Sequence, residues 1–190
     1  MDEMKEYAQK KDVPVLQDAS LEQLLKWIKD NQVCSFLEIG TAIAKTSIAV
    51  ATSDPQIKVV TIERDPQMIR QAQQNIRNAG LTDRITLIEG DALDVCVTGV
   101  FDCIFIDAAK AQYRRFFEKF APLLSNNGII ITDNMNFHGL VDHPERTQNR
   151  NTKALVRKIK SYREYLQSLT DYQTTFYDIG DGMAITRRES

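Results

Sequence analysis

The chain has 190 residues and is 43% hydrophobic, which is enough apolar material for one core and argues against a second folded domain. Its 24 basic and 26 acidic residues give a formal net charge of −2, a balance that does not indicate a general nucleic-acid binder. The sequence has no apolar run of about 18 residues and no hydrophobic core of a signal peptide, so we expect a cytoplasmic protein without a membrane span.

The three cysteines, Cys34, Cys96 and Cys103, form no CxxC pair. An odd number of cysteines without paired spacing indicates neither a disulfide framework nor a zinc site. We therefore expect all three to be small core residues in a reducing compartment.

Two helices are predicted at the start of the chain. The first is a polar helix over residues 2–10, and the second is an amphipathic helix over 20–31 that begins with Ser20 as its cap. We expect residues 1–31 to form a helical cap and residues 33–190 to form the core of a single domain that spans the whole chain, residues 1–190.

Short apolar runs then alternate with helical patterns. Strands are predicted at 34–39, 58–63, 85–89, 101–106, 128–133, 172–177 and 183–186, and helices at 45–53, 66–79, 112–124 and 152–169. Apolar strands without strict alternation are typical of a mostly parallel sheet that is covered by helices on both faces. The turn Ile179–Gly182 favours an antiparallel hairpin at the C-terminus. The sequence therefore predicts an α/β fold with a mostly parallel seven-stranded sheet.

Ligands of such sheets bind beyond the carboxyl ends of the strands. The first strand ends at Gly40 with a single glycine and without the GxGxxG pattern of a dinucleotide site. A ligand without phosphates, such as S-adenosylmethionine, needs only a close approach at Gly40, and Glu38 could face its cationic amino-acid end. The same turn is equally consistent with plain architecture.

Two further acids follow strands. Glu63 ends the second strand, where a carboxylate can accept both hydroxyls of a ribose, although a solvated acid would also fit there. Asp91 follows the third strand, where it could contact an adenine edge or cap a short helix.

The pair of neighbouring strand ends Asp107 and Asp133-Asn134 is the sharpest feature of the sequence. Two carboxylates and an amide oxygen are hard ligands without sulfur or imidazole, and they suit Mg²⁺ or Mn²⁺ better than zinc. Acids at strand ends also act as caps, but two adjacent ends of this kind favour a metal site.

The order of these motifs resembles the cation-dependent class I O-methyltransferases, the catechol and caffeoyl-coenzyme A methyltransferase group, which implies a Rossmann-like fold. The motifs are Glu38–Thr41, Thr61–Glu63, Gly90–Ala92, Ile106–Lys110 and Thr132–Asn134. Within that group the chain is similar to the bacterial branch that methylates 5-hydroxyuridine at the wobble position of tRNA. The segments that carry this narrower likeness are Tyr7-Ala8, Val13–Leu16, Ala111–Tyr113, Phe137–Val141, Asn149–Thr152 and Ile179–Gly182.

The resemblance implies a set of site residues and a homodimer. The S-adenosylmethionine pocket would be lined by Leu16, Glu38, Gly40, Thr46, Glu63, Asp91, Ala92 and Asp107. The metal, Mg²⁺ or Mn²⁺, would be held by Asp107, Asp133 and Asn134, and the catalytic residues would be Lys110 and Asp107. The chain departs from the family pattern in the first turn, where Ala44 and Lys45 replace a glycine and an aromatic residue.

Three functions remain open: a tRNA methyltransferase, a small-molecule catechol-type O-methyltransferase and a non-catalytic binding protein of the same fold. The last is weakest because every metal position is filled. For the first, Arg146, Arg150 and Lys153 open a basic run that could contact the tRNA anticodon loop. The run could also be a solvated helix face. The histidines nearby, His138 and His143, could serve as a base or a metal ligand. Because Asp133 and Asn134 already offer oxygen donors, we expect both histidines to pack in the loop over 138–151.

Overall fold

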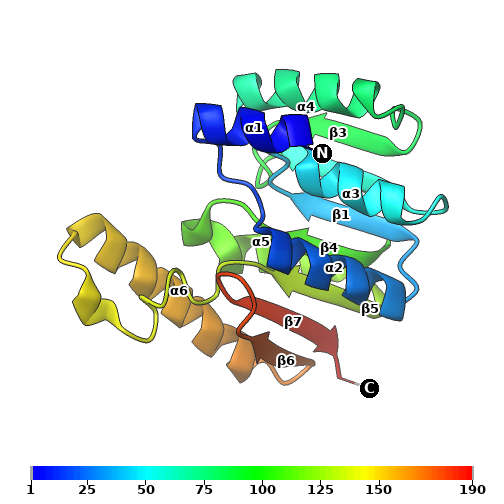
Figure 1. The fold of residues 1–190 in the computed structure, drawn as a ribbon. Helices are drawn as coiled ribbons and strands as arrows, with labels where there is room; N and C mark the ends of the chain where they lie inside the picture. Colours follow the sequence, from blue (N-terminus) through cyan, green and yellow to red (C-terminus); the bar gives the residue numbers. More distant parts are fainter. Residues whose placement is uncertain (1, 190) are drawn as a thin grey trace.

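The computed structural model describes residues 2–189, which form a seven-stranded sheet between two layers of helices (Figure 1). The strand order is β3-β2-β1-β4-β5-β7-β6. The strands are β1 (Ser35–Ile39), β2 (Lys58–Glu63), β3 (Ile85–Glu89), β4 (Phe101–Ile106), β5 (Leu124–Thr132), β6 (Tyr172–Tyr177) and β7 (Met183–Arg188). The first five are parallel, whereas β7 lies antiparallel between β5 and β6. The predicted Rossmann-like fold with its C-terminal antiparallel pair is confirmed.

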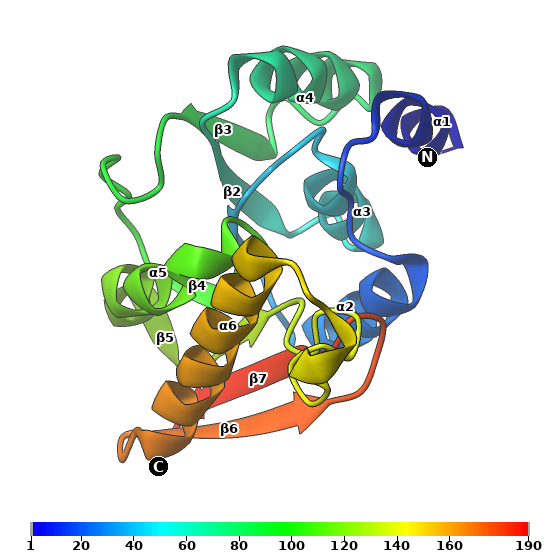
Figure 2. The ribbon, with the colours of Figure 1, turned by 90° about the vertical axis from the view of Figure 1, so that its left-hand side faces the viewer.

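The helices cover both faces of this sheet (Figure 2). They are α1 (Asp2–Lys11), α2 (Asp18–Asp30), α3 (Lys45–Ser53), α4 (Pro66–Asn78), α5 (Tyr113–Phe120) and α6 (Arg150–Ser168), with short 3-10 helices η1 (Lys110–Gln112), η2 (Ala121–Leu123) and η3 (Pro144–Arg146). Phe36 and Phe105 pack in the core beneath α2, α3 and α4, and Leu37 and Ile104 pack in the core beneath α5 and α6. Burial of both strand faces explains the unbroken apolar runs.

Some predicted boundaries differ from the structure. Helix α2 begins at Asp18 after Gln17, so Ser20 is buried inside the first turn and does not cap the helix. Helix α5 ends at Phe120 because Pro122 lies in the following turn, and β5 already begins at Leu124.

The loop before α6 is also shorter than predicted. Asn149 caps α6 by accepting hydrogen bonds from the N–H groups of Asn151 and Thr152, at 2.9 and 3.1 Å. The prediction for the cysteines is wrong for two of the three: Cys103 is buried in β4, but Cys34 precedes β1 and Cys96 lies in the loop before β4, and both are exposed. Among the described residues, every helix is too short or too polar to cross a bilayer.

Candidate active site

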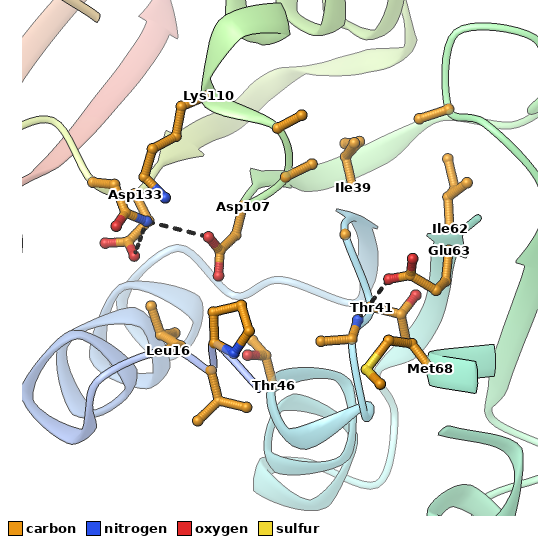
Figure 3. A pocket seen from close by; sticks show the side chains of 18 of the residues that line it. Leu16, Ile39, Thr41, Thr46, Ile62, Glu63, Met68, Asp107, Lys110 and Asp133 are labelled. Carbon is orange, nitrogen blue, oxygen red and sulfur yellow. Dashed lines mark hydrogen bonds between the residues drawn. The ribbon is translucent and has the colours of Figure 1, made fainter. Parts of the chain in front are cut away.

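A cavity of about 580 Å³ lies at the carboxyl ends of the parallel strands, where the sheet topology predicts a ligand site. Residues 13–17, which lie between α1 and α2, form the wall across the cavity from the strand ends (Figure 3). We call this segment the strap. Figure 3 shows two ends of this cavity. The β4 end carries Asp107, Lys110 and Asp133, and the β2 end carries Glu63 and Met68.

The turn after β1 brings the backbone of Gly40 against β4. Gly40 has a φ of +100°, and a Cβ atom at this position would lie 2.2 Å from the carbonyl oxygen of Asp107. A ligand is therefore not the reason for this glycine, because the neighbouring backbone already requires it. Ala44, where the family pattern has a second glycine, adopts a left-handed φ of +65°.

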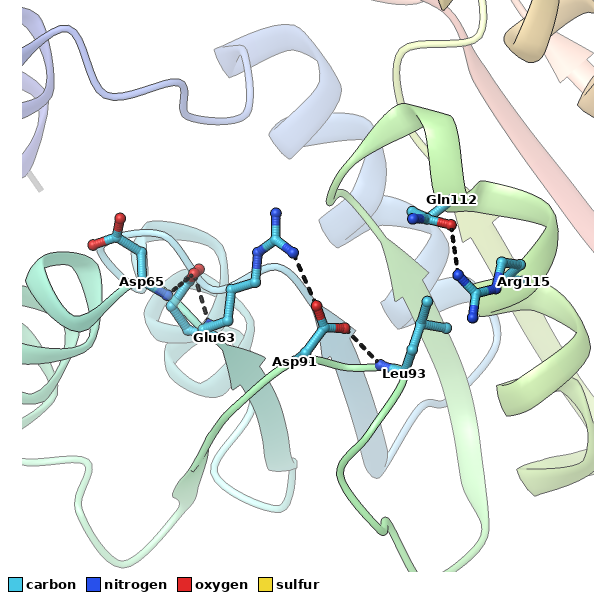
Figure 4. Close-up of polar contacts among 7 residues, drawn as sticks. Glu63, Asp65, Asp91, Leu93, Gln112 and Arg115 are labelled. Carbon is cyan, nitrogen blue, oxygen red and sulfur yellow. Dashed lines mark hydrogen bonds and ion pairs between the residues drawn. The ribbon is translucent and has the colours of Figure 1, made fainter.

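Glu63 lines the cavity with a carboxylate that backbone groups hold in place. One oxygen accepts a hydrogen bond from the N–H of Ala42 at 2.8 Å, and the other accepts from the N–H groups of Arg64 and Asp65, both at 2.9 Å (Figure 4). A carboxylate has about four acceptor positions, so capacity for a further donor remains. Glu63 is thus oriented by the turns around it and is not a freely solvated acid.

Asp91 lines the same end of the cavity, next to the buried Ala92. Its carboxylate accepts hydrogen bonds from the N–H of Leu93 and from the guanidinium of Arg64, both at 2.9 Å (Figure 4). These two interactions, the first most strongly, lower the pKa of Asp91. Asp91 closes a turn rather than capping a helix, because the residues after it form no helix.

The strap and α3 contribute apolar and hydroxyl groups toward the β4 end. Leu16 in the strap and Thr46 in the first turn of α3 both line the cavity and are both largely buried. Figure 3 shows the two side chains on the wall that faces Asp107. The predicted pocket residues from five separate segments of the sequence therefore meet in one cavity.

Glu38 is the exception among the predicted pocket residues. It lies within β1 and points to the sheet face that α3 covers, where Ser47 and Thr61 donate hydrogen bonds to its carboxyl. It is 1% exposed and does not line the cavity. Burial raises the pKa of Glu38 to about 8. Strand alternation directs its side chain into the core, so the structure does not bring Glu38 to the cavity, and its contact with a ligand stays a prediction.

Asp107, Asp133 and Asn134 form a cluster at the β4 end. The side-chain amide of Asn134 donates to Asp133 at 2.8 Å and to Asp107 at 3.3 Å (Figure 3). Burial, and for Asp133 also the charge of Asp107, raises the pKa of both carboxyls. Two neighbouring carboxylates, one buried and one half-buried, repel each other when both are charged, so a cation between them would relieve the repulsion.

The cluster has acceptor capacity to spare. The Oδ1 atom of Asp133 is buried and has no hydrogen-bond partner among the described residues. A half-turn of the Asn134 amide exchanges its nitrogen and oxygen, and would give the cluster a third oxygen donor. Within residues 2–189 no three His, Cys, Asp or Glu side chains are close enough together to hold a metal, so a site here depends on the amide of Asn134.

Lys110 begins η1 and reaches over the same end of the cavity (Figure 3). Its ammonium lies 5.8 Å from the ring centroid of Phe137, and its charge opposes the rise in the pKa of both Asp107 and Asp133. Lys110 is therefore a lining residue of the cavity.

The sequence did not point to Asp181, which also lines the cavity. It lies in the turn between β6 and β7 and accepts a hydrogen bond from the N–H of His138, whose ring nitrogen Nδ1 is 3.6 Å from the same carboxyl oxygen. The pattern Gly180–Gly182 predicts a hairpin turn, and nothing in it indicates that this turn reaches the acids after β5. His138 lines the cavity with a side chain that is 71% exposed, and the side chain of His143 is 51% exposed, so the prediction that the two histidines pack in the loop is wrong.

The predicted basic residues do not line the cavity, but they follow its lining residues Phe137 and His138 in the chain. The chain leaves the cavity at Phe137 and His138 and reaches Arg146 in η3, then Arg150 and Lys153 in the first turn of α6. Helix α6 contains six basic residues and one acidic residue. In Figure 1 its N-terminal end projects on the side of the sheet where the parallel strands end.

Comparison with known proteins agrees with this arrangement. The O-methyltransferase family profile matches residues 2–189. A catechol O-methyltransferase of Niastella koreensis is 30% identical over 166 residues, which is 81% of this chain and 73% of that protein. A crystal structure from Staphylococcus aureus with the provisional name caffeoyl-CoA O-methyltransferase is 38% identical, with a TM-score of 0.95 over 99% of this chain and 91% of that one.

A more distant structure, the O-methyltransferase of Bacillus cereus in complex with SAH, shares the fold with a TM-score of 0.85 at 24% identity, over 99% of this chain and 90% of that one. The chain therefore belongs to the O-methyltransferase family and is an S-adenosylmethionine-dependent O-methyltransferase.

Proposed function

We propose that the cavity binds S-adenosylmethionine with its adenosine toward the β2 end and its methionine toward the β4 end. Glu63 would accept a ribose hydroxyl, since its carboxylate is already fixed and retains acceptor capacity. Asp91 and Ala92 would border the adenine, and Asp107 would face the methionine amine. Because β1 lies between β2 and β4, Gly40 lies between these two ends, and the sulfonium would lie over the turn that follows β1.

We infer that a divalent cation, Mg²⁺ or Mn²⁺, is held by Asp107, Asp133 and Asn134. The observation that carries this proposal is the unpartnered, buried Oδ1 of Asp133 next to the half-buried carboxylate of Asp107. When bound, such an ion lowers the pKa of a hydroxyl that it contacts and so favours the nucleophilic oxyanion. The chain itself positions the acceptor, and the ammonium of Lys110 stabilises the developing negative charge.

For the acceptor we propose the 5-hydroxyl of uridine at the wobble position of tRNA, which would become 5-methoxyuridine. The basic start of α6 supports this choice, since it adjoins the cavity wall at Phe137 and His138. Phosphate neutralisation supplies much of the affinity for nucleic acids, and an anticodon loop can present an unstacked base to a pocket.

The tRNA proposal is tested by methyl incorporation into tRNA that carries 5-hydroxyuridine, into the same tRNA with uridine and into catechol. We expect transfer to the first only. The double variant Arg150→Ala/Lys153→Ala should raise KM for tRNA about tenfold and flatten its salt dependence, because each lost phosphate contact lowers the slope by about one.

A matched control removes the same charge elsewhere. The exposed lysines Lys26 and Lys29 lie on α2, so the variant Lys26→Ala/Lys29→Ala should leave KM for tRNA unchanged. Methylation of catechol alone would refute the tRNA acceptor, and so would an equal KM for tRNA in the two double variants. Either result would leave the methyltransferase assignment intact.

A small catechol-type substrate is the second candidate. The similarity to the catechol O-methyltransferase of Niastella koreensis favours it. Two adjacent oxygens of a catechol and the 5-hydroxyl beside the uracil carbonyl offer similar donor pairs to one cation, so the same cluster suits either acceptor.

A further inference from the structure

Lys45, which starts α3, is a buried cation in the wall of the cavity. Its side chain is 4% exposed. Its Nζ atom donates to the carbonyl oxygen of Leu16 at 2.8 Å and to Asp18 at 3.1 Å. Lysine is almost never fully buried without partners, so these two contacts account for its position.

The contact with Leu16 joins α3 to the middle of the strap. The strap contains no helix or strand, and backbone hydrogen bonds fasten its two ends, from the N–H of Val13 to Ala8 and from the N–H of Leu21 to Gln17. The hydrogen bond from Lys45 to Leu16 holds the strap between those two ends. The ion pair with Asp18 contributes less, because that carboxylate is 59% exposed.

This fastening lies at one particular end of the cavity. Leu16 accepts the hydrogen bond from Lys45, and Thr46 follows Lys45 in the chain. Both lie at the β4 end of the cavity with Asp107, whereas Glu63 lies at the other end (Figure 3). In the cofactor orientation proposed above, the β4 end receives the methionine part of S-adenosylmethionine. Leu16, the strap residue that Lys45 holds, therefore covers the amino-acid part of the cofactor.

We propose that Lys45 is a positioning residue that sets the affinity for the methionine part of the cofactor by holding the strap against α3. The inference rests on the proposed orientation of the cofactor. Loss of the ammonium leaves the carbonyl of Leu16 without its buried donor and frees the middle of the strap. The nucleoside end, held at β2, keeps its contacts.

Calorimetry with two ligands tests this role. S-adenosylhomocysteine has the amino-acid part, and 5′-methylthioadenosine lacks it. We expect Lys45→Met to raise the Kd for S-adenosylhomocysteine at least tenfold and to change the Kd for 5′-methylthioadenosine less than about twofold, the size expected for loss of one charged hydrogen bond at that end. Lys45→Arg should restore most of the affinity. Lys58→Met, at the exposed lysine that begins β2 and so lies at the other end of the strands, should change neither Kd.

Kinetics and hydrogen exchange give independent readings. Lys45→Met should raise KM for S-adenosylmethionine while kcat at saturation stays within about twofold, the signature of lost binding shared by ground and transition states. In the unaltered protein, S-adenosylhomocysteine should protect the amides of residues 13–17 and 5′-methylthioadenosine should not, a result that needs no variant to fold.

Equal weakening of both ligands by Lys45→Met, or equal protection of the strap by both, would overturn the role of Lys45. Absence of any binding of S-adenosylhomocysteine to the unaltered protein would instead overturn the proposed cofactor site.

Discussion

Replacing Asp133 with alanine is expected to abolish detectable turnover and to weaken Mn²⁺ binding at least tenfold. The reason is that Asp133 carries the unpartnered buried oxygen of the cluster and lies against Asp107 and Asn134. Changes around metal sites cost about 10–100-fold in affinity or activity even at the partners of the ligands, so loss of a ligand should cost at least as much. Calorimetric titration with Mn²⁺ measures the binding directly and without an acceptor.

The matched control is Asp83→Ala, which removes an exposed aspartate that precedes β3, at the other end of the strands. It should leave Mn²⁺ binding and turnover unchanged. Binding of S-adenosylhomocysteine should survive in Asp133→Ala, which shows that the fold is intact. Full activity after exhaustive EDTA treatment, or Mn²⁺ binding in Asp133→Ala equal to that of the unaltered protein, would refute the metal site.

Replacing Gly40 with alanine is expected to lower the free energy of unfolding by at least about 3 kcal/mol, the sum of an unfavourable backbone conformation and a steric overlap. The new Cβ atom would lie 2.2 Å from the carbonyl oxygen of Asp107 and 3.2 Å from the Cα of Ala108. Both are backbone atoms of the segment that follows β4, so neither can move away cheaply. Denaturant unfolding measures the loss.

Gly80→Ala separates the two contributions. Gly80 also has a positive φ, +67°, but a Cβ atom there would meet no atom within 4 Å. We expect this variant to lose only about 1–2 kcal/mol, the cost of a left-handed conformation alone. If both alanine variants lose the same stability, the contact between Gly40 and β4 is not what requires the glycine.

The sheet and the acids at its edge were predictable because they follow from local patterns. Strands buried on both faces must be apolar throughout, and the carboxyl ends of parallel strands must meet at one edge. That reasoning placed Glu63, Asp91, Asp107 and Asp133 around one site, and the structure brings all four to one cavity.

The remaining features depend on contacts between distant segments. Glu38 follows the same pattern of an acid near a strand end, yet it lies one residue before the end of β1 and points into the core beside Ser47. Asp181 reaches the cavity only because β7 inserts between β5 and β6. In the sequence Lys45 is an ordinary lysine at the start of a helix, and its hydrogen bond to Leu16 in the strap follows only from the tertiary structure.

The most direct measurement of the central claim, that this cavity holds the cofactor, is calorimetric titration of S-adenosylhomocysteine into the unaltered protein, Glu63→Gln and Glu89→Gln. Glu89 ends β3 in register with Glu63 but does not line the cavity. We predict binding to the unaltered protein and no change for Glu89→Gln. Binding to Glu63→Gln should be at least about tenfold weaker, since a hydrogen bond to a charged group is worth about 1.5–3 kcal/mol. No binding to the unaltered protein, or equal affinity for all three proteins, would contradict the assignment.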